Sequence, residues 1–204
     1  MTATLAPPEE KAIALVLHLS PLLKKLDEQE FYEFCMLNKD LRLELTSEGD
    51  LIIMSPTGGT TGIRNFKLIV EFGNWVLKDG TGKGFDSSTV FSLPNGAKRS
   101  PDLAWLRNER WEALTERERE AFPPLCPDFV VELRSPTDRL NYLQEKMEEY
   151  VSNGARLGWL IDPFEKKVYV YRPQTAVEVL DDPPTISGEP SLPGFVLDVQ
   201  ALWE

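Results

Sequence analysis

Apolar residues recur along the chain with two different periods, and each period predicts a different kind of element. The stretch 27–37 follows a helical period, and Asp27 with Glu30 three residues later matches a capping box. Residues 41–46 alternate strictly between apolar and polar, and 51–54 follow a Gly-Asp turn, so these two segments are predicted to form a hairpin. Beyond the Ser-Pro-Thr-Gly-Gly breaker a second helix is predicted, with apolar positions at Ile63, Phe66, Ile69, Val70, Gly73 and Val76.

The same two periods continue through the rest of the chain. Extended segments are predicted at 83–93, 101–106 and 129–134, and an apolar hairpin at 156–161 and 167–172. Helices are predicted at 108–121, at 139–152 after a Ser-Pro-Thr-Asp cap, and near 197–203. This order of elements predicts a mixed α/β domain with one central sheet.

Length and composition support one globular domain. The chain has 204 residues, 42% of them hydrophobic, which is enough to bury a core. Residues 1–25 are predicted to form an N-terminal tail or an extra helix, and residues 26–204 the domain. Ala12 to Leu19 has the apolar character of a signal-peptide core, but two glutamates precede it and Pro21 follows it, which argues against a signal.

Charge and cysteine usage exclude several classes of protein. The formal net charge of −11 argues against a protein that coats nucleic acid non-specifically, because neutralising phosphates needs a basic surface. Cys35 and Cys126 lie far apart and outside any metal-binding spacing, which is typical of a reducing compartment. No apolar run approaches the length of a membrane span. We therefore expect a cytoplasmic protein with no membrane partner.

Most familiar catalytic groups are missing from the sequence. His18 is the single histidine and lies in the N-terminal segment, so histidine catalysis is not expected. No phosphate-binding Gly-Lys-Ser/Thr loop follows the paired glycines. Ser100 and Ser135 each precede a proline and have no nearby base, which leaves serine nucleophiles without support. Carboxylates and lysine remain.

Three carboxylates occur on predicted strands, where an acid is normally unfavourable. Glu44, Asp102 and Glu132 are these residues, and Glu132 lies within the most apolar strand of the chain. A carboxylate buried there must be paired or must bind a cation. Each acid alone is equally consistent with an exposed strand face or with salt bridges to Arg42 and Arg134. The three together indicate a functional site.

The helix that follows Glu132 adds a basic candidate. Lys146 lies at the edge of the apolar stripe of helix 139–152 and 40° from Tyr150, at 100° per residue. Glu145, Glu148 and Glu149 are predicted to point elsewhere. Lys146 either extends along the apolar surface to solvent or reaches a site at the end of the neighbouring strand. Helical geometry alone does not decide between these two interpretations.

The spacing of these residues resembles a known nuclease motif. Pro101-Asp102, followed by Glu132-Leu133-Arg134, resembles the PD-(D/E)XK motif of the restriction-endonuclease-like superfamily. More specifically, the chain resembles a family of predicted restriction endonucleases that is abundant in cyanobacteria and was formerly labelled a domain of unknown function. The resemblance covers about residues 27–203. Its segments are Arg42 to Glu44, Ile53 to Gly59, Arg99 to Asp102, Pro127 to Pro136, Leu143 to Tyr150 and Gly158 to Pro163.

The resemblance implies a role for each candidate. Asp102 and Glu132 would be the metal-binding carboxylates and Glu44 an upstream acid. Arg134 occupies the position of the superfamily lysine, and the family's migrated lysine corresponds to Lys146. Arg134 cannot act as a base but could stabilise phosphate charge, and Tyr150 is a further accessory candidate. The histidine that many relatives carry after the Ser-Pro motif is replaced here by residues 60–62, Thr-Thr-Gly.

The resemblance therefore implies a restriction-endonuclease-like α/β fold and a Mg²⁺-dependent DNA endonuclease, with Mn²⁺ as a substitute. We expect Glu44, Asp102, Glu132 and Lys146 to converge on one cleft. We expect Arg134 to share the face of Glu132 and to contact a carboxylate in that cleft. Two alternatives remain open: a catalytically silent dimerising or DNA-binding module on the same fold, and a phosphohydrolase acting on nucleotides. A homodimer is a further expectation.

Overall fold

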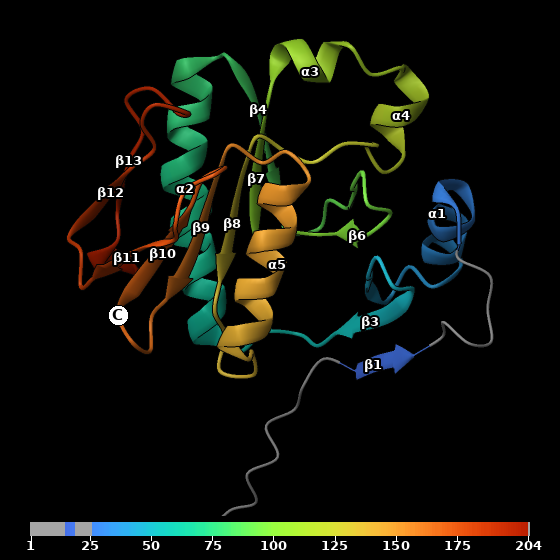
Figure 1. Cartoon of the computed structure of the whole chain (residues 1–204), viewed down its shortest axis with the longest axis horizontal. Coiled ribbons are helices and arrows are strands. Elements are labelled where there is room, and N and C mark those ends of the chain that lie inside the picture. The colour runs from blue at the N-terminus through green and yellow to red at the C-terminus, as the bar shows by residue number, and fades with distance from the viewer. Residues whose placement is uncertain (1–14, 19–25, 204) are drawn as a thin grey trace, which may run out of the picture.

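The chain folds into two larger β-sheets that meet beside one helix. The computed structural model describes residues 15–18 and 26–203 (Figure 1). A five-stranded antiparallel sheet comes from the N-terminal half of the described chain. In order across the sheet, its strands are β1 (Leu15–His18), β3 (Asp50–Met54), β2 (Arg42–Leu45), β6 (Lys98–Arg99) and β5 (Phe91–Ser92).

The second sheet has six strands and forms the centre of the fold. Across the sheet these are β11 (Glu178–Asp181), β10 (Lys167–Tyr171), β9 (Leu157–Asp162), β8 (Phe129–Leu133), β7 (Leu103–Arg107) and β4 (Gly82–Asp86). Neighbouring strands are antiparallel except β8 and β9, which run parallel. Helix α5 (Leu140–Ser152) makes the crossover that this parallel pair needs.

Helices cover both faces of the six-stranded sheet, with α5 in front and α2 (Gly59–Asp79) behind (Figure 1). The face toward α2 also carries the two-stranded ribbon of β12 (Thr185–Ser187) and β13 (Val196–Asp198), with the short 3-10 helix η1 (Gln200–Leu202). Alternation along β8 divides its side chains: Phe129, Val131 and Leu133 join the α2 core, and Val130 joins the α5 core. Each face of the sheet therefore has its own hydrophobic core.

Local sequence signals explain where several helices begin and end. Helix α1 (Glu28–Leu37) begins with the expected capping box between Asp27 and Glu30. Helix α2 ends at Gly80, whose left-handed backbone (φ 69°) suits glycine. The charged segment 108–121 forms two short helices, α3 (Asn108–Glu112) and α4 (Glu116–Glu120), because Thr115 caps a new helix. None of the helices in the described segments is long and apolar enough to cross a membrane.

The structure corrects several of the element predictions. The six-stranded sheet is the expected mixed central sheet, but the hairpin of β2 and β3 does not belong to it and forms a separate five-stranded sheet with β1, β5 and β6. Residues 15–18, expected in a tail or an extra helix, form strand β1 against β3. The rest of segment 1–25 lies outside the described residues. The terminal helix expected near 197–203 is reduced to β13 and η1. The predicted cap of α5 is absent, because the Asp138 side chain accepts from the Ser135 amide instead.

Candidate active site

The four principal candidates converge where the two sheets meet α5. Glu44 comes from β2 of the five-stranded sheet, Asp102 from the residue before β7, Glu132 from β8 and Lys146 from α5. All four line one cavity of about 180 Å³. The geometric expectation is confirmed, because Asp102 and Glu132 lie on the same side of the sheet.

The pleat of β8 and the period of α5 explain this convergence. Glu132 points toward α5, as Val130 does two residues earlier. Lys146 and Tyr150 are four residues apart and so share one face of α5. Both reach the same oxygen, Glu132 Oε1, with Lys146 Nζ at 2.8 Å and Tyr150 Oη at 3.0 Å. Lys146 therefore does not extend to solvent, and its side chain is only 3% exposed.

Glu44 is held by cations and by the backbone. Its Oε1 accepts from Lys146 Nζ at 2.9 Å and from the Ser100 amide at 2.8 Å. Its Oε2 accepts from Arg99 at 3.3 Å. Arg99 Nε also donates to Glu149 at 2.5 Å. The Lys146 ammonium is thus held between two carboxylates, those of Glu44 and Glu132.

Asp102 is tied directly to the strand that carries Glu132. Its Oδ2 accepts from the Leu133 amide at 2.8 Å, so the two carboxylates belong to one rigid unit. Their other oxygens, Asp102 Oδ1 and Glu132 Oε2, accept no hydrogen bond from the residues that the structure describes. The cavity is therefore lined by two carboxylate oxygens that remain available to a ligand.

Burial and like charges raise the pKa of both of these carboxyls. Burial is the main cause that raises the pKa of Glu132 to about 8. The nearby Lys146 ammonium lowers this pKa, but the Asp102 and Glu44 carboxylates raise it and, together with burial, outweigh Lys146. Burial also raises the pKa of Asp102, against the opposing Leu133 amide and Lys146. A bound cation would favour the ionised form of both carboxyls and so oppose the effect of burial on each pKa.

Glu44, Lys146 and Tyr150 keep their ordinary charges. Burial alone would raise the pKa of Glu44, but Lys146, Arg99 and the Ser100 amide bring it below its usual value. Burial would lower the pKa of Lys146, but the Glu132 and Glu44 carboxylates raise it above its usual value. Burial, with Glu132 and Glu44, raises the pKa of Tyr150 well above its usual value. Lys146 is therefore a cation and Tyr150 a neutral donor at every physiological pH.

The carboxylates of the cavity are of the kind that bind the metal implied by the resemblance. Within the described segments, no group of three His, Cys, Asp or Glu side chains is arranged to hold a metal ion. Two carboxylates are nevertheless the usual protein share for Mg²⁺, which keeps several of its waters. The available oxygens of Asp102 and Glu132 are hard donors of this kind, so the residues fit Mg²⁺ or Mn²⁺ better than Zn²⁺, which prefers nitrogen and sulfur ligands.

Comparison with known proteins now identifies the family. The Uma2 family, described as "Putative restriction endonuclease", matches residues 28–200, which is most of the chain. The chain belongs to the Uma2 family. No curated protein matches it significantly.

A solved structure confirms the fold expected for a Uma2 chain. It is described as a crystal structure of a putative nuclease belonging to DUF820 from Anabaena variabilis ATCC 29413. The two chains share 21% sequence identity, and the match covers 87% of this chain and 97% of the other with a TM-score of 0.72. The restriction-endonuclease-like α/β fold is therefore confirmed.

One site prediction for this Uma2 chain is wrong. Arg134 does not contact a carboxylate in the cavity, because β8 ends at Leu133 and alternation no longer determines the direction of the next side chain. Its guanidinium lies 2.7 Å from Asp162 at the end of β9 and also over the Phe164 ring. Tyr150, the other accessory candidate, does contact Glu132.

Sequence reasoning also missed two members of the site. The sequence assigns no role to Arg99 beyond its place in the Arg-Ser-Pro-Asp segment. In the structure its guanidinium donates hydrogen bonds to both Glu44 and Glu149. Glu149 was predicted to point away, but it follows Lys146 by three residues and therefore lies near the same helix face. The available signal is that Arg99 precedes Asp102 by three residues and Glu149 follows Lys146 by three residues.

Proposed function

We propose that this chain is a Mg²⁺-dependent DNA endonuclease that hydrolyses phosphodiester bonds at this cavity, with Mn²⁺ able to substitute. One observation supports the proposal most strongly: Asp102 and Glu132 line a single cavity together with the buried Lys146 cation. Phosphodiester hydrolysis needs an activated water and compensation of negative charge, and this donor set can supply both. Membership of a family described as restriction endonucleases makes DNA the favoured substrate.

Asp102 and Glu132 are proposed to hold the metal ion through their available oxygens. The bound ion would lower the pKa of a coordinated water and offset charge on the phosphate. Asp102 is oriented for this role by the Leu133 amide, and Glu132 by the Tyr150 hydroxyl. Both carboxylates are therefore positioned before any ligand binds, which lowers the cost of reorganisation.

Lys146 is proposed to act as a cation rather than as a base. Its raised pKa keeps it protonated, so it cannot accept a proton from water. It can orient the attacking water or stabilise the charge that develops on the phosphate. Glu44 and Arg99 position Lys146 and are not proposed to touch the substrate.

Cleavage of supercoiled plasmid and of mononucleotides tests the proposal. We expect the wild type to nick or linearise plasmid in Mg²⁺ or Mn²⁺ and to lose this activity in excess EDTA. Asp102→Asn and Glu132→Gln should abolish both cleavage and the rise in melting temperature that the ion produces by binding the folded state. Lys146→Ala should retain ion binding but lose cleavage by on the order of 10²–10³-fold.

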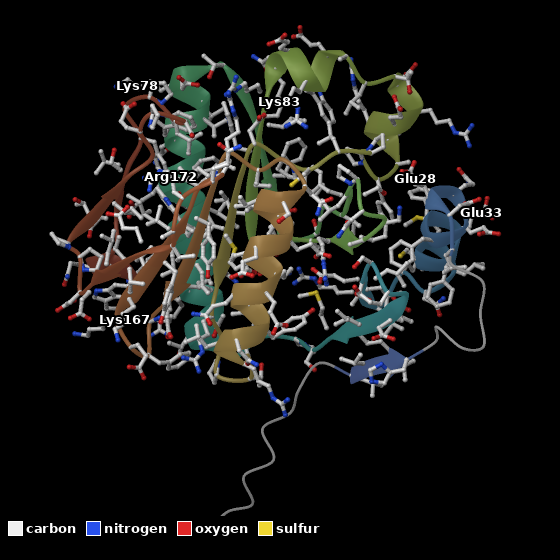
Figure 2. All side chains as sticks on the ribbon, in the orientation of Figure 1. Glu28, Glu33, Lys78, Lys83, Lys167 and Arg172 are labelled. Atoms are coloured by element: carbon white, nitrogen blue, oxygen red, sulfur yellow. The ribbon has the colours of Figure 1, made fainter. Side chains whose placement is uncertain are left out.

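Two surface variants provide matched controls. Glu116→Gln and Lys78→Ala remove the same charges at exposed positions, and neither residue lines the cavity. Lys78 lies near the C-terminal end of α2 (Figure 2). Melting temperatures must accompany the Lys146 data, because removing a buried cation leaves its carboxylates uncompensated. Cleavage that is unchanged in excess EDTA would contradict the mechanism.

The same panel separates the two alternatives. Ion binding with no cleavage of any nucleic acid would favour the silent module. Hydrolysis of mononucleotides with intact plasmid would favour the nucleotide phosphohydrolase, which is compatible with the net charge of −11.

A further inference from the structure

Helix α2 carries an apolar face that is exposed to solvent. The core contacts of α2 come from Leu68 and Phe72, which lie on the opposite side of the helix from this face. The exposed face, here called the apolar arc, consists of five large side chains. They are Ile63, Phe66, Ile69, Val70 and Leu77, with exposed fractions of 59, 69, 37, 42 and 86%.

The spacing of the apolar arc is that of a helix–helix contact. Ile63, Phe66, Val70, Gly73 and Leu77 follow each other at intervals of three, four, three and four residues. This is the heptad pattern that places apolar side chains in the holes of a facing helix. The pattern identifies a helix as the occupant rather than a strand or an extended peptide.

The rest of the described chain leaves the apolar arc uncovered and covers the neighbouring charged side of α2. Arg64 donates to the Trp203 carbonyl at 3.4 Å, and Lys67 to the Ala201 carbonyl at 2.8 Å. Glu71 accepts from the Asp198 amide at 3.1 Å. The C-terminal segment therefore packs beside α2 and not over the apolar arc.

The exposed area is large enough for a dimer. Side chains of roughly 150–200 Å² at these exposed fractions leave on the order of 500 Å² of apolar surface on each chain, near the upper end for a monomer. Two such faces would bury about 1,000 Å² through these five residues alone, which reaches the minimum of about 1,000 Å² for a biological interface. Contacts at the edges would add to this area.

The apolar arc is also complementary to itself. A cavity of about 470 Å³ opens beside it, between α2 and β4, and is lined by Gly73, Val76 and Leu77 among others. Phe66 is an exposed knob two to three turns away on the same helix. In an antiparallel pair of α2 helices, Phe66 of each copy lies opposite Leu77 and the cavity of the other. Val70 then lies opposite Gly73, which has no Cβ and has open space around it.

We propose that a second copy of this chain docks on the apolar arc, with the two α2 helices antiparallel about a two-fold axis. Such an isologous contact closes on itself and gives a dimer rather than a filament. The proposal is independent of the proposed endonuclease activity, because no residue of the apolar arc lines the catalytic cavity.

Sedimentation equilibrium of the full chain over a range of concentrations tests the dimer. We expect a reversible monomer–dimer equilibrium, and we expect Phe66→Asp and Leu77→Glu each to raise the dissociation constant by on the order of 100-fold. Leu37→Glu is the matched control, since Leu37 on α1 is 85% exposed and lies outside the apolar arc. It should leave the equilibrium unchanged. A wild type that stays monomeric at every concentration overturns the proposal.

Cysteine cross-linking tests the antiparallel register. Both native cysteines are buried, so introduced surface cysteines can be followed selectively. A mixture of the Val70→Cys and Gly73→Cys variants should form disulfide-linked dimers faster than either variant alone. Faster linking within the Val70→Cys variant alone would indicate parallel helices and overturn the proposed register. Binding of a monomer to phosphatidylcholine vesicles, lost in Phe66→Asp, would assign the apolar arc to a lipid surface and also overturn the proposal.

Discussion

Glu132 is the residue at which burial and negative charge conflict most strongly. It is surrounded by two other carboxylates, and its one close cation, Lys146, is shared with Glu44. The result is a carboxyl whose pKa is raised to about 8 in the absence of an ion. Near neutral pH the divalent ion proposed above would therefore have to displace a proton from this group in order to bind fully.

The pH dependence of stability should reveal this conflict. In EDTA the folded state holds the Glu132 proton up to about pH 8, whereas the unfolded chain releases it near 4.5. The unfolded state binds fewer protons in this window, so the free energy of unfolding should fall as pH rises through it. Mg²⁺ should raise the melting temperature by an amount that grows toward pH 8 and then levels off.

Thermal denaturation with and without Mg²⁺ checks this expectation, and Glu132→Gln provides the control. The variant should show a weaker loss of stability with pH, because only the raised pKa of Asp102 then contributes in this direction. It should also show no increment from the ion. A Mg²⁺ increment that is equal at pH 6 and pH 8 would contradict the raised pKa of Glu132.

At the same scale, the sequence predicted the residues of the site better than their partners. Glu44, Asp102 and Glu132 could be found because an acid in an apolar strand needs a counter-charge. Arg99 could not be found as the partner of Glu44, because 55 residues separate the two and only the tertiary fold joins them. The predicted direction of the Arg134 side chain is wrong because β8 ends at Leu133, and the alternation of side chains holds only within a strand.

Among the elements, α5 controls the position of Lys146. The helix packs closely on β9, and a Cβ atom built on Gly158 would lie 2.4 Å from the Met147 methyl group. Glycine at this position lets Met147 pack against the sheet, and Lys146 is the preceding residue on the same helix. The depth of α5 above the sheet therefore sets the reach of the Lys146 ammonium.

Gly158→Val should displace the Met147 side chain and so disturb the packing of α5 on β9. We expect a loss of about 1–3 kcal/mol in the free energy of unfolding from overpacking, together with reduced cleavage. Adding Met147→Ala should recover part of both losses, because it removes the side chain that clashes. Gly62→Ala in α2, where a Cβ atom meets nothing within 4 Å, is the control and should stabilise the protein slightly. Chemical denaturation and plasmid cleavage measure the two effects.

Element types were largely predictable from periodicity, but their assembly was not. The α1 capping box, the hairpin of β2 and β3 and the hairpin of β9 and β10 are local and matched expectation. The five-stranded sheet is completed by β6, a strand of two residues that joins β2 and β5. Two residues carry no periodic signal, so the arrangement of the sheets had to come from the structure.

For the molecule as a whole, the site joins the two sheets. Glu132 and Lys146 both belong to the continuous β8–α5–β9 segment, whereas Glu44 belongs to the five-stranded sheet. The ion pair between Glu44 and Lys146 spans 102 residues of sequence. The cavity that these residues line is thus complete only when both sheets are in place.

This long sequence separation has a consequence for the order of folding. Contacts between distant parts of a chain require costly loop closure, so we expect β8–α5–β9 to form in the transition state and the Glu44 contacts to form after it. Glu44→Gln should then accelerate unfolding, on the order of 10²-fold for a loss of about 3 kcal/mol, with little change in the folding rate. Val131→Ala, within the early segment, should instead slow folding, and stopped-flow kinetics in denaturant would distinguish the two variants. Equal slowing of folding by both would place the joining of the two sheets in the nucleus itself, before the barrier rather than after it.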